Sequence, residues 1–115
     1  MSHIHVESLE GADALVDALG RADRIALDCE AAGFHRYSDR LCLAQVTALG
    51  STWTIDPLAF DATDLLREPL EREDLPVVMH GSDFDLRLLS RDLGIRIRGL
   101  VLIVAAYATA SLGFG

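Results

Sequence analysis

Apolar and polar residues alternate along three runs in the first half of the chain, at 24–29, 41–47 and 52–55. Successive side chains of an extended chain point to opposite sides, so this alternation predicts three β-strands. Only a short gap around Gly50 separates the last two runs, which predicts a hairpin between them. Two shorter apolar runs predict an edge strand at 4–6 and a buried strand at 77–79.

Between these runs, the apolar residues recur at helical spacing. A helix is predicted at 11–19, and Gly20 is expected to end it. A second helix is predicted from Asp61, a residue suited to the N-cap, and is expected to stop before Pro69. A third helix is predicted over 82–94.

The last apolar stretch, 100–114, contains no charged residue. It is shorter than the roughly 20 residues that a membrane-spanning helix needs, so it predicts a buried helix over 100–110 and no membrane contact. A hairpin followed by strands and helices in alternation predicts an α/β fold. We expect one mixed sheet flanked by helices, in a single domain over residues 1–115.

The composition indicates which partners and which location to expect. The 115 residues include 18 acidic and 10 basic ones, all arginine, and the net charge of −8 disfavours non-specific adhesion to nucleic acid or anionic lipid. Cys29 and Cys42 each lie in an apolar run, which predicts buried free thiols of a reducing compartment. The amino-terminal segment lacks the basic and apolar regions of a secretory signal, so we expect a cytoplasmic location.

Two carboxylates share one side of the first long strand run. Asp28 and Glu30 fall on the side opposite to the apolar residues, and like charges at that distance repel each other. One interpretation is a solvated strand end that pairs with Arg36 or Arg40. The other is a site that binds a cation.

A third carboxylate, Asp85, lies in the middle of the apolar arc of the helix at 82–94. The opposite arc contains Arg87, Ser90 and Arg91, so we expect Asp85 to point inward and the arginines to face solvent. A buried carboxylate needs a partner. Asp85 also stands three residues after Ser82, the position of a capping-box acid, which would explain it without any functional role.

The three acids together predict a metal site. Carboxylates at close quarters raise one another's pKa unless a cation neutralises them. Hard oxygen ligands select Mg²⁺ or Mn²⁺, with water and substrate phosphate completing the coordination shell.

Two segments in this order resemble the ribonuclease D-like branch of the DEDD 3′–5′ exonucleases. The segment IALDCEAAGFHRYSDRLCLAQVT is similar to the family's first motif, and VVMHGSDFDLRLLSRDLG is similar to its second. The resemblance implies an RNase H-like fold and metal-dependent hydrolysis at the 3′ end of single-stranded nucleic acid. It also implies that Asp28, Glu30 and Asp85 are the first three catalytic metal ligands.

The family's third motif, a Tyr followed four residues later by the fourth Asp ligand, has no counterpart here, because no acidic residue follows Asp92. The domain is therefore expected to be incomplete at its C-terminus, either as a fragment or as a degenerate member. We expect little activity from the isolated chain unless a partner chain supplies the missing part.

Two other classes of function stay open. A non-catalytic module with the same fold would bind nucleic acid without a divalent ion, through the arginines at 87, 91, 96 and 98. A structural fragment would instead associate through an uncovered sheet edge and its apolar tail, and would not run as a monomer in size-exclusion chromatography.

Overall fold

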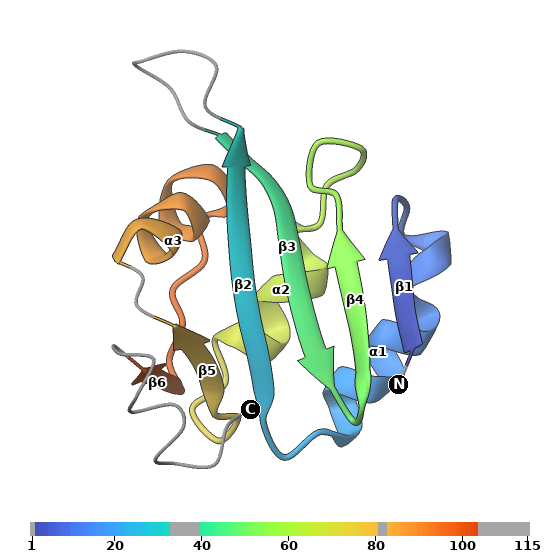
Figure 1. Cartoon of the computed structure of the whole chain (residues 1–115), viewed down its shortest axis with the longest axis horizontal. Coiled ribbons are helices and arrows are strands. Elements are labelled where there is room, and N and C mark those ends of the chain that lie inside the picture. The colour runs from blue at the N-terminus through green and yellow to red at the C-terminus, as the bar shows by residue number, and fades with distance from the viewer. Residues whose placement is uncertain (1, 33–39, 81–82, 104–115) are drawn as a thin grey trace.

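In the computed structural model, residues 2–32, 40–80 and 83–103 are described, and they form one mixed sheet with helices (Figure 1). The sheet has six strands in the order β1-β4-β3-β2-β5-β6. The strand bounds are β1 Ser2–Val6, β2 Ile25–Ala32, β3 Arg40–Ala48, β4 Ser51–Ile55, β5 Val77–His80 and β6 Leu100–Ile103. The predicted α/β architecture with a mixed sheet is confirmed.

Strand direction changes at the centre of the sheet. The strands β2, β3 and β4 are antiparallel neighbours, whereas β1 joins β4 in parallel, and β5 and β6 continue from β2 in parallel. The predicted hairpin is the connection between β3 and β4. It turns through Leu49 and Gly50, both with positive φ (51° and 79°), the combination that a tight turn between twisted strands requires.

The helices lie on one side of this sheet and at its end. Helix α1 (Asp13–Arg21) follows a 3₁₀ turn (η1, Glu10–Ala12), and α2 is Thr63–Leu70. Both lie behind the sheet in Figure 1. Helix α3 (Asp83–Leu88), continued by a π-helical turn (η2, Leu89–Leu93), lies beside the part of β2 that extends past β5.

The two faces of β2 differ as the alternation predicts. Ile25, Leu27 and Cys29 are buried, and they belong to the apolar core with the inner residues of α1 and α2. Asp28 and Glu30 are exposed on the opposite face. The sheet therefore separates a helix-covered apolar face from a face that carries the two carboxylates.

Two predicted helix ends are wrong. Helix α1 continues through Gly20 to Arg21, because the N–H of Ala22 still bonds to the carbonyl of Ala18 at 2.9 Å and the chain becomes extended only at Ala22. Helix α2 includes Pro69, whose fixed φ fits a helix and whose missing N–H removes only one bond near the helix end. The predicted N-cap is also displaced by one residue, because the N-cap of α2 is Ala62, and the carboxylate of Asp61 just before it accepts a hydrogen bond from the N–H of Thr63 at 3.0 Å.

The predicted helix over 100–110 is also wrong where it can be checked, because Leu100–Ile103 is strand β6, parallel to β5. The run at 100–103 consists of apolar residues without alternation, so its periodicity does not distinguish a strand from a buried helix. Residues 104–110 lie outside the described residues, as do Ser82 and Arg36. Within the described residues, no helix has the length and apolar character to cross a membrane.

Candidate functional site

The candidate site lies where β2 extends beyond its neighbour β5. The two strands pair only at Ile25 and Ala26 of β2, and the N–H of Ile25 points to this side, bonding to the carbonyl of Pro76 at 2.9 Å. Alternate residues of a strand direct their N–H groups to the same side. The N–H of Cys29, four residues further along, therefore points past the end of β5, where no strand residue is paired with it.

Asp85 of α3 supplies the acceptor at this position. Its Oδ2 lies 3.3 Å from the backbone nitrogen of Cys29, and the Asp85 residue is only 8% exposed. The inward orientation predicted from the helical pattern is confirmed, and so is the exposure of Arg87, Ser90 and Arg91 on the opposite arc. The partner that a buried carboxylate needs is a backbone N–H of the strand that contains the other two acids.

Asp28 accepts a hydrogen bond from the same N–H. Its Oδ1 lies 3.1 Å from the backbone nitrogen of Cys29, so the carboxylates of Asp28 and Asp85 converge on one donor. Glu30 lies two residues further along, exposed on the same face of β2 as Asp28. Among the described residues, neither Asp28 nor Glu30 forms an ion pair with Arg40, and Arg36, the other predicted partner, lies outside those residues.

The pKa of the Cys29 thiol is raised beside these carboxylates. Burial raises its pKa from 9.0 to about 12, and the carboxylates of Asp85 and then Asp28 act in the same direction. Cys29 and Cys42 are both free cysteines, as predicted, although Cys42 is only partly buried. A thiol held protonated in this way is neither a nucleophile nor a metal ligand at neutral pH.

A β-bulge lies next to Glu30. Glu30 pairs with Leu43 and Ala31 pairs with Leu41, so Cys42 is the extra residue on β3. The bulge shifts the alternation and turns Leu41 into the core, where it is 2% exposed. The Sγ of Cys42 donates to the carbonyl of Glu30 at 3.4 Å.

Asp92 links η2 to the bulge in β3. Its Oδ2 accepts the N–H of Leu41 at 2.7 Å, and its Oδ1 accepts Nε of Arg91, also at 2.7 Å. These bonds, with Arg91 contributing most, hold the pKa of Asp92 below its ordinary value. The helix that positions Asp85 is thus tied to β3 at one end and, through Asp85, to β2 at the other.

The described residues do not contain a closed metal site. No three His, Cys, Asp or Glu side chains among them lie close enough together to hold a metal ion. Asp28 and Asp85 are brought together at Cys29, and Glu30 shares the strand and exposed face of Asp28 without completing a cluster among the described residues. The assignment of these three residues as metal ligands therefore stays a prediction.

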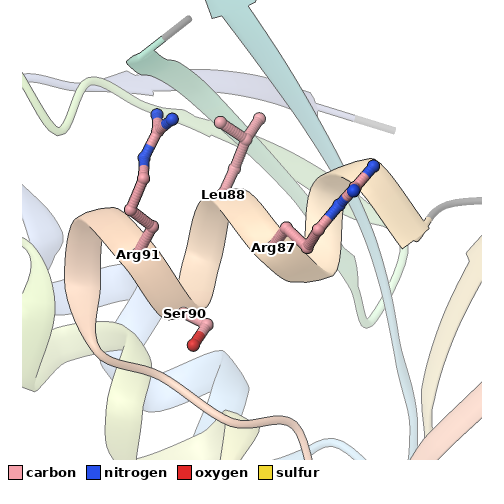
Figure 2. Close-up of a pocket in the computed structure, with 4 residues that line it drawn as sticks. All are labelled: Arg87, Leu88, Ser90 and Arg91. Carbon is pink, nitrogen blue, oxygen red and sulfur yellow. The ribbon is translucent and has the colours of Figure 1, made fainter. Parts of the chain in front are cut away.

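A basic hollow lies on the outer side of α3. Arg87, Leu88, Ser90 and Arg91 line it, with a volume of about 510 Å³ (Figure 2). Arg91 is engaged by Asp92, whereas Arg87 is exposed on the helix that contains Asp85. This hollow thus places Arg87 on the same helix as Asp85.

Sequence reasoning missed two contributors to the site. The N–H of Cys29 has one signal in the sequence, because the run at 77–79 is much shorter than the run at 24–29, so pairing between the two would leave backbone donors without a strand partner. Gln45 lies directly opposite Asp28 in the β2–β3 register and is partly buried. Directly opposed residues of an antiparallel pair share a face, so the Gln45 side chain is on the same face of the sheet as Asp28.

Comparison with known proteins gives a consistent result. The family described as 3′–5′ exonuclease matches residues 4–114 of the chain. Ribonuclease D of Zymomonas mobilis is 36% identical over 83 residues, which is 70% of this chain and 21% of that protein. The exosome complex component 10 homologue of Caenorhabditis elegans is 30% identical over 96 residues, which is 83% of this chain and 11% of that protein. The chain thus spans about a fifth or less of the length of these relatives.

Solved structures of related proteins have a similar fold. The catalytic core of RRP6 from Trypanosoma brucei has a TM-score of 0.78 at 30% identity, with 87% of this chain and 28% of that chain covered. Escherichia coli RNase D has a TM-score of 0.77 at 23% identity, with 89% and 27% covered.

Proposed function

Because the chain belongs to the 3′–5′ exonuclease family of ribonuclease D and RRP6, we propose that its carboxylate site serves metal-dependent removal of nucleotides from a 3′ end. The chain has the RNase H-like exonuclease fold of that family, as its sequence predicts. In this proposal Asp28, Glu30 and Asp85 are the metal ligands and the catalytic residues, and Mg²⁺ or Mn²⁺ is the cofactor.

The observation that supports the proposal is the convergence of Asp28 and Asp85 on the N–H of Cys29. Two carboxylates that converge on one backbone N–H concentrate negative charge at that point, which favours a bound cation. The donor set fits a hard ion, because Mg²⁺ is commonly held by one or two carboxylates together with water and substrate phosphates. When bound, such an ion activates water and stabilises the leaving oxygen of a phosphodiester.

The residues of the chain would do the positioning. The hydrogen bonds from Cys29 fix one oxygen of each carboxylate, which holds Asp28 and Asp85 beside each other at the end of β5. Glu30 lies two residues after Asp28, on the same exposed face of β2. Gln45, opposite Asp28, brings a neutral amide that can donate to a phosphate oxygen without adding charge.

A single-stranded nucleic acid is the proposed substrate. Ribonuclease D of Trypanosoma brucei, 22% identical, has been solved in complex with the RNA U12, and the EXD2 exonuclease domain, 18% identical, has been soaked in Mg and GMP. Binding through a metal also accommodates the net charge of −8, since the phosphate then meets a cation rather than bare carboxylates.

We further propose that the 115-residue chain alone is impaired. The family resemblance requires a fourth carboxylate and a tyrosine four residues before it, and no acidic residue follows Asp92 in this sequence. For full activity, both groups would have to come from outside these 115 residues.

Binding of Mn²⁺ to the 115-residue chain, followed by electron paramagnetic resonance, tests the metal site without requiring turnover. Asp28→Asn and Asp85→Asn are each expected to weaken binding by about tenfold or more, because each removes one of few charged ligands. Asp23→Asn, an exposed acid in the loop before β2, is the matched control and is expected to change nothing. Absence of binding, or equal loss in the control, would contradict the proposal.

Activity is tested with Mn²⁺ and a 3′-labelled single-stranded oligonucleotide. We expect little or no shortening by the isolated chain. Stepwise shortening that Asp28→Ala abolishes would overturn the proposed impairment while supporting the exonuclease site, whereas shortening that survives Asp28→Ala would overturn the site itself.

A second candidate function rests on the basic hollow of Figure 2. Arg87 and Arg91 lie one helical turn apart on the exposed side of α3 and η2, an arrangement suited to a phosphate backbone. A non-catalytic binding module would use this surface, so its oligonucleotide affinity would survive chelation of divalent ions and Asp28→Ala, and would fall with Arg87→Ala.

A further inference from the structure

A groove runs between α1 and α2 on the side of these helices that faces away from the sheet. It has a volume of about 410 Å³ and lies over neighbouring helices. Its apolar lining consists of Leu9, Val16, Leu19, Gly20, Leu65 and Pro69. Because α1 and α2 pack on the core face of β2, the groove and the carboxylates of Asp28 and Glu30 lie on opposite sides of the sheet.

The groove exposes apolar side chains that the core does not use. Leu9 is 60% exposed and Val16 is 53% exposed, and both line the groove on its α1 side. Leu65 of α2 is partly buried beneath them. Single exposed apolar residues are ordinary, but these are gathered in one concave site, the arrangement found in binding grooves.

Gly20 lines the same groove from inside helix α1. A Cβ built on Gly20 meets no heavy atom within 4 Å, so the chain itself has room for a side chain at this position. A helical Gly is less stable than Ala by about 0.5–1 kcal/mol, and packing within this chain does not explain that cost. Its absent side chain instead lets another backbone approach the groove closely.

The rim of the groove is negatively charged. Asp64 and Glu68 of α2 line it and are exposed, and Asp13 of α1 lies one turn before Val16 on the helix surface. Among the described lining residues the one basic side chain is Arg72, which donates to the carboxylate of Asp74 through bonds of 2.9 and 3.1 Å. A second copy of this chain would bring like charges together at this rim, which disfavours self-association.

We propose that this α1–α2 groove binds one amphipathic helix of a partner protein, with apolar residues at i, i+3/i+4 and i+7 seated between α1 and α2. Lysine or arginine side chains beside that ridge would meet Asp64 and Glu68. The interaction is of the helix-in-groove type, in which the apolar ridge supplies affinity and the flanking charges set orientation. It does not depend on the proposed nuclease site, because the two surfaces lie on opposite sides of the sheet.

Two synthetic peptides of identical composition test the groove, one with a leucine ridge flanked by lysines and one scrambled to destroy the ridge. Fluorescence anisotropy at about 0.15 M salt measures their affinity for the 115-residue chain. The ridge peptide is expected to bind about tenfold more tightly than the scrambled one. Equal affinity for both peptides, or no binding of either, would overturn the proposal.

Two variants and one control locate the binding. Gly20→Gln places a side chain in the groove and is expected to weaken peptide binding about tenfold. Because Gln has a higher helix propensity than Gly, this loss of affinity cannot be assigned to unfolding. Glu68→Lys reverses a rim charge and is expected to weaken binding about fivefold. Glu30→Lys makes the same charge change on the opposite side of the sheet and should leave affinity within about twofold.

Two results would contradict this assignment. Equal weakening by Glu30→Lys and Glu68→Lys would show that the peptide responds only to total charge. Concentration-dependent dimerisation of the wild-type chain that Gly20→Gln and Glu68→Lys both abolish would assign the groove to a second copy instead.

Discussion

Oδ2 of Asp85 lies 3.3 Å from the backbone nitrogen of Cys29, a contact that joins residues 56 positions apart in the chain. The contact exists because β5 stops short and leaves that N–H without a strand partner, while α3 begins beside it (Figure 1). The backbone N–H of Cys29 needs an acceptor, and the carboxylate of Asp85 provides one. This hydrogen bond positions a carboxylate that the family resemblance assigns to catalysis.

Replacement of Asp85 tests this contact. Asp85→Ala is expected to lower the free energy of unfolding by about 1–2 kcal/mol, because it weakens the pairing of a buried N–H and empties a buried site. Asp85→Asn keeps an acceptor oxygen of the same shape and is expected to cost less than about 1 kcal/mol. Urea unfolding measures both, and equal losses for the two variants would show that the hydrogen bond to Cys29 contributes nothing.

The raised pKa of Cys29 predicts a loss of stability in alkaline solution. The thiol titrates at 9.0 when unfolded and at about 12 in the fold, so the folded state binds more protons between these values. Stability is therefore fully present below pH 9 and falls by up to about 1.4 kcal/mol per pH unit as the pH rises toward 12.

Cys29→Ala removes this proton linkage, so the difference between wild type and variant isolates it from other groups that titrate in base. Urea unfolding at pH 8, 9, 10 and 11 should show the wild type losing its advantage over Cys29→Ala step by step. A difference that stays constant across this range would contradict the prediction. Cys42→Ala, at the partly buried thiol, is the matched control.

Asp92 predicts the opposite dependence on pH. Its pKa is held below the ordinary value of 3.8 by Arg91 and by the N–H of Leu41, so its contribution is present above pH 4 and is lost as the pH falls through the lowered pKa. Asp92→Asn is expected to cost about 1 kcal/mol at pH 7. Thermal unfolding should show this gap closing below pH 4.

Asp74→Asn provides the comparison for Asp92. Its pKa is lowered as well, by Arg72, but it is fully exposed and bonds to no backbone group of another element. An exposed ion pair contributes little, so this variant is expected to leave the free energy of unfolding almost unchanged. A larger loss from Asp74→Asn than from Asp92→Asn would contradict the role given to the bulge contact.

The sequence predicts those parts of the fold that depend on local periodicity. The strands β2, β3 and β4 show alternation because one face is buried, and the inward position of Asp85 follows from the helical pattern alone. Strand β6 was missed because its run has no alternation, and Gly20 was misread because helix ends depend on the packing around them.

The site is predicted only in part, for a physical reason. Residue types and their faces identify Asp28, Glu30 and Asp85, but the contact between Asp85 and Cys29 depends on where β5 ends relative to β2. The bulge at Cys42 depends on the register between β2 and β3, which is a property of two segments and not of either one.

Gly99 provides a test of how the edge of the sheet is packed. A Cβ built at this position collides with the carbonyl oxygen of Leu75 and lies 2.9 Å from its carbonyl carbon, so both backbones would have to move apart. The carbonyl of Gly99 accepts the N–H of Val77 at 2.8 Å, and that bond starts the pairing of β5 with β6. Gly99→Ala is therefore expected to cost about 2–3 kcal/mol, the range of severe overpacking.

Gly20→Ala makes the same chemical change where nothing lies within 4 Å and is expected to add about 0.5–1 kcal/mol. Urea unfolding of the pair measures the contrast, and a Gly99→Ala variant as stable as Gly20→Ala would show that the approach of Leu75 to Gly99 is not required by the fold.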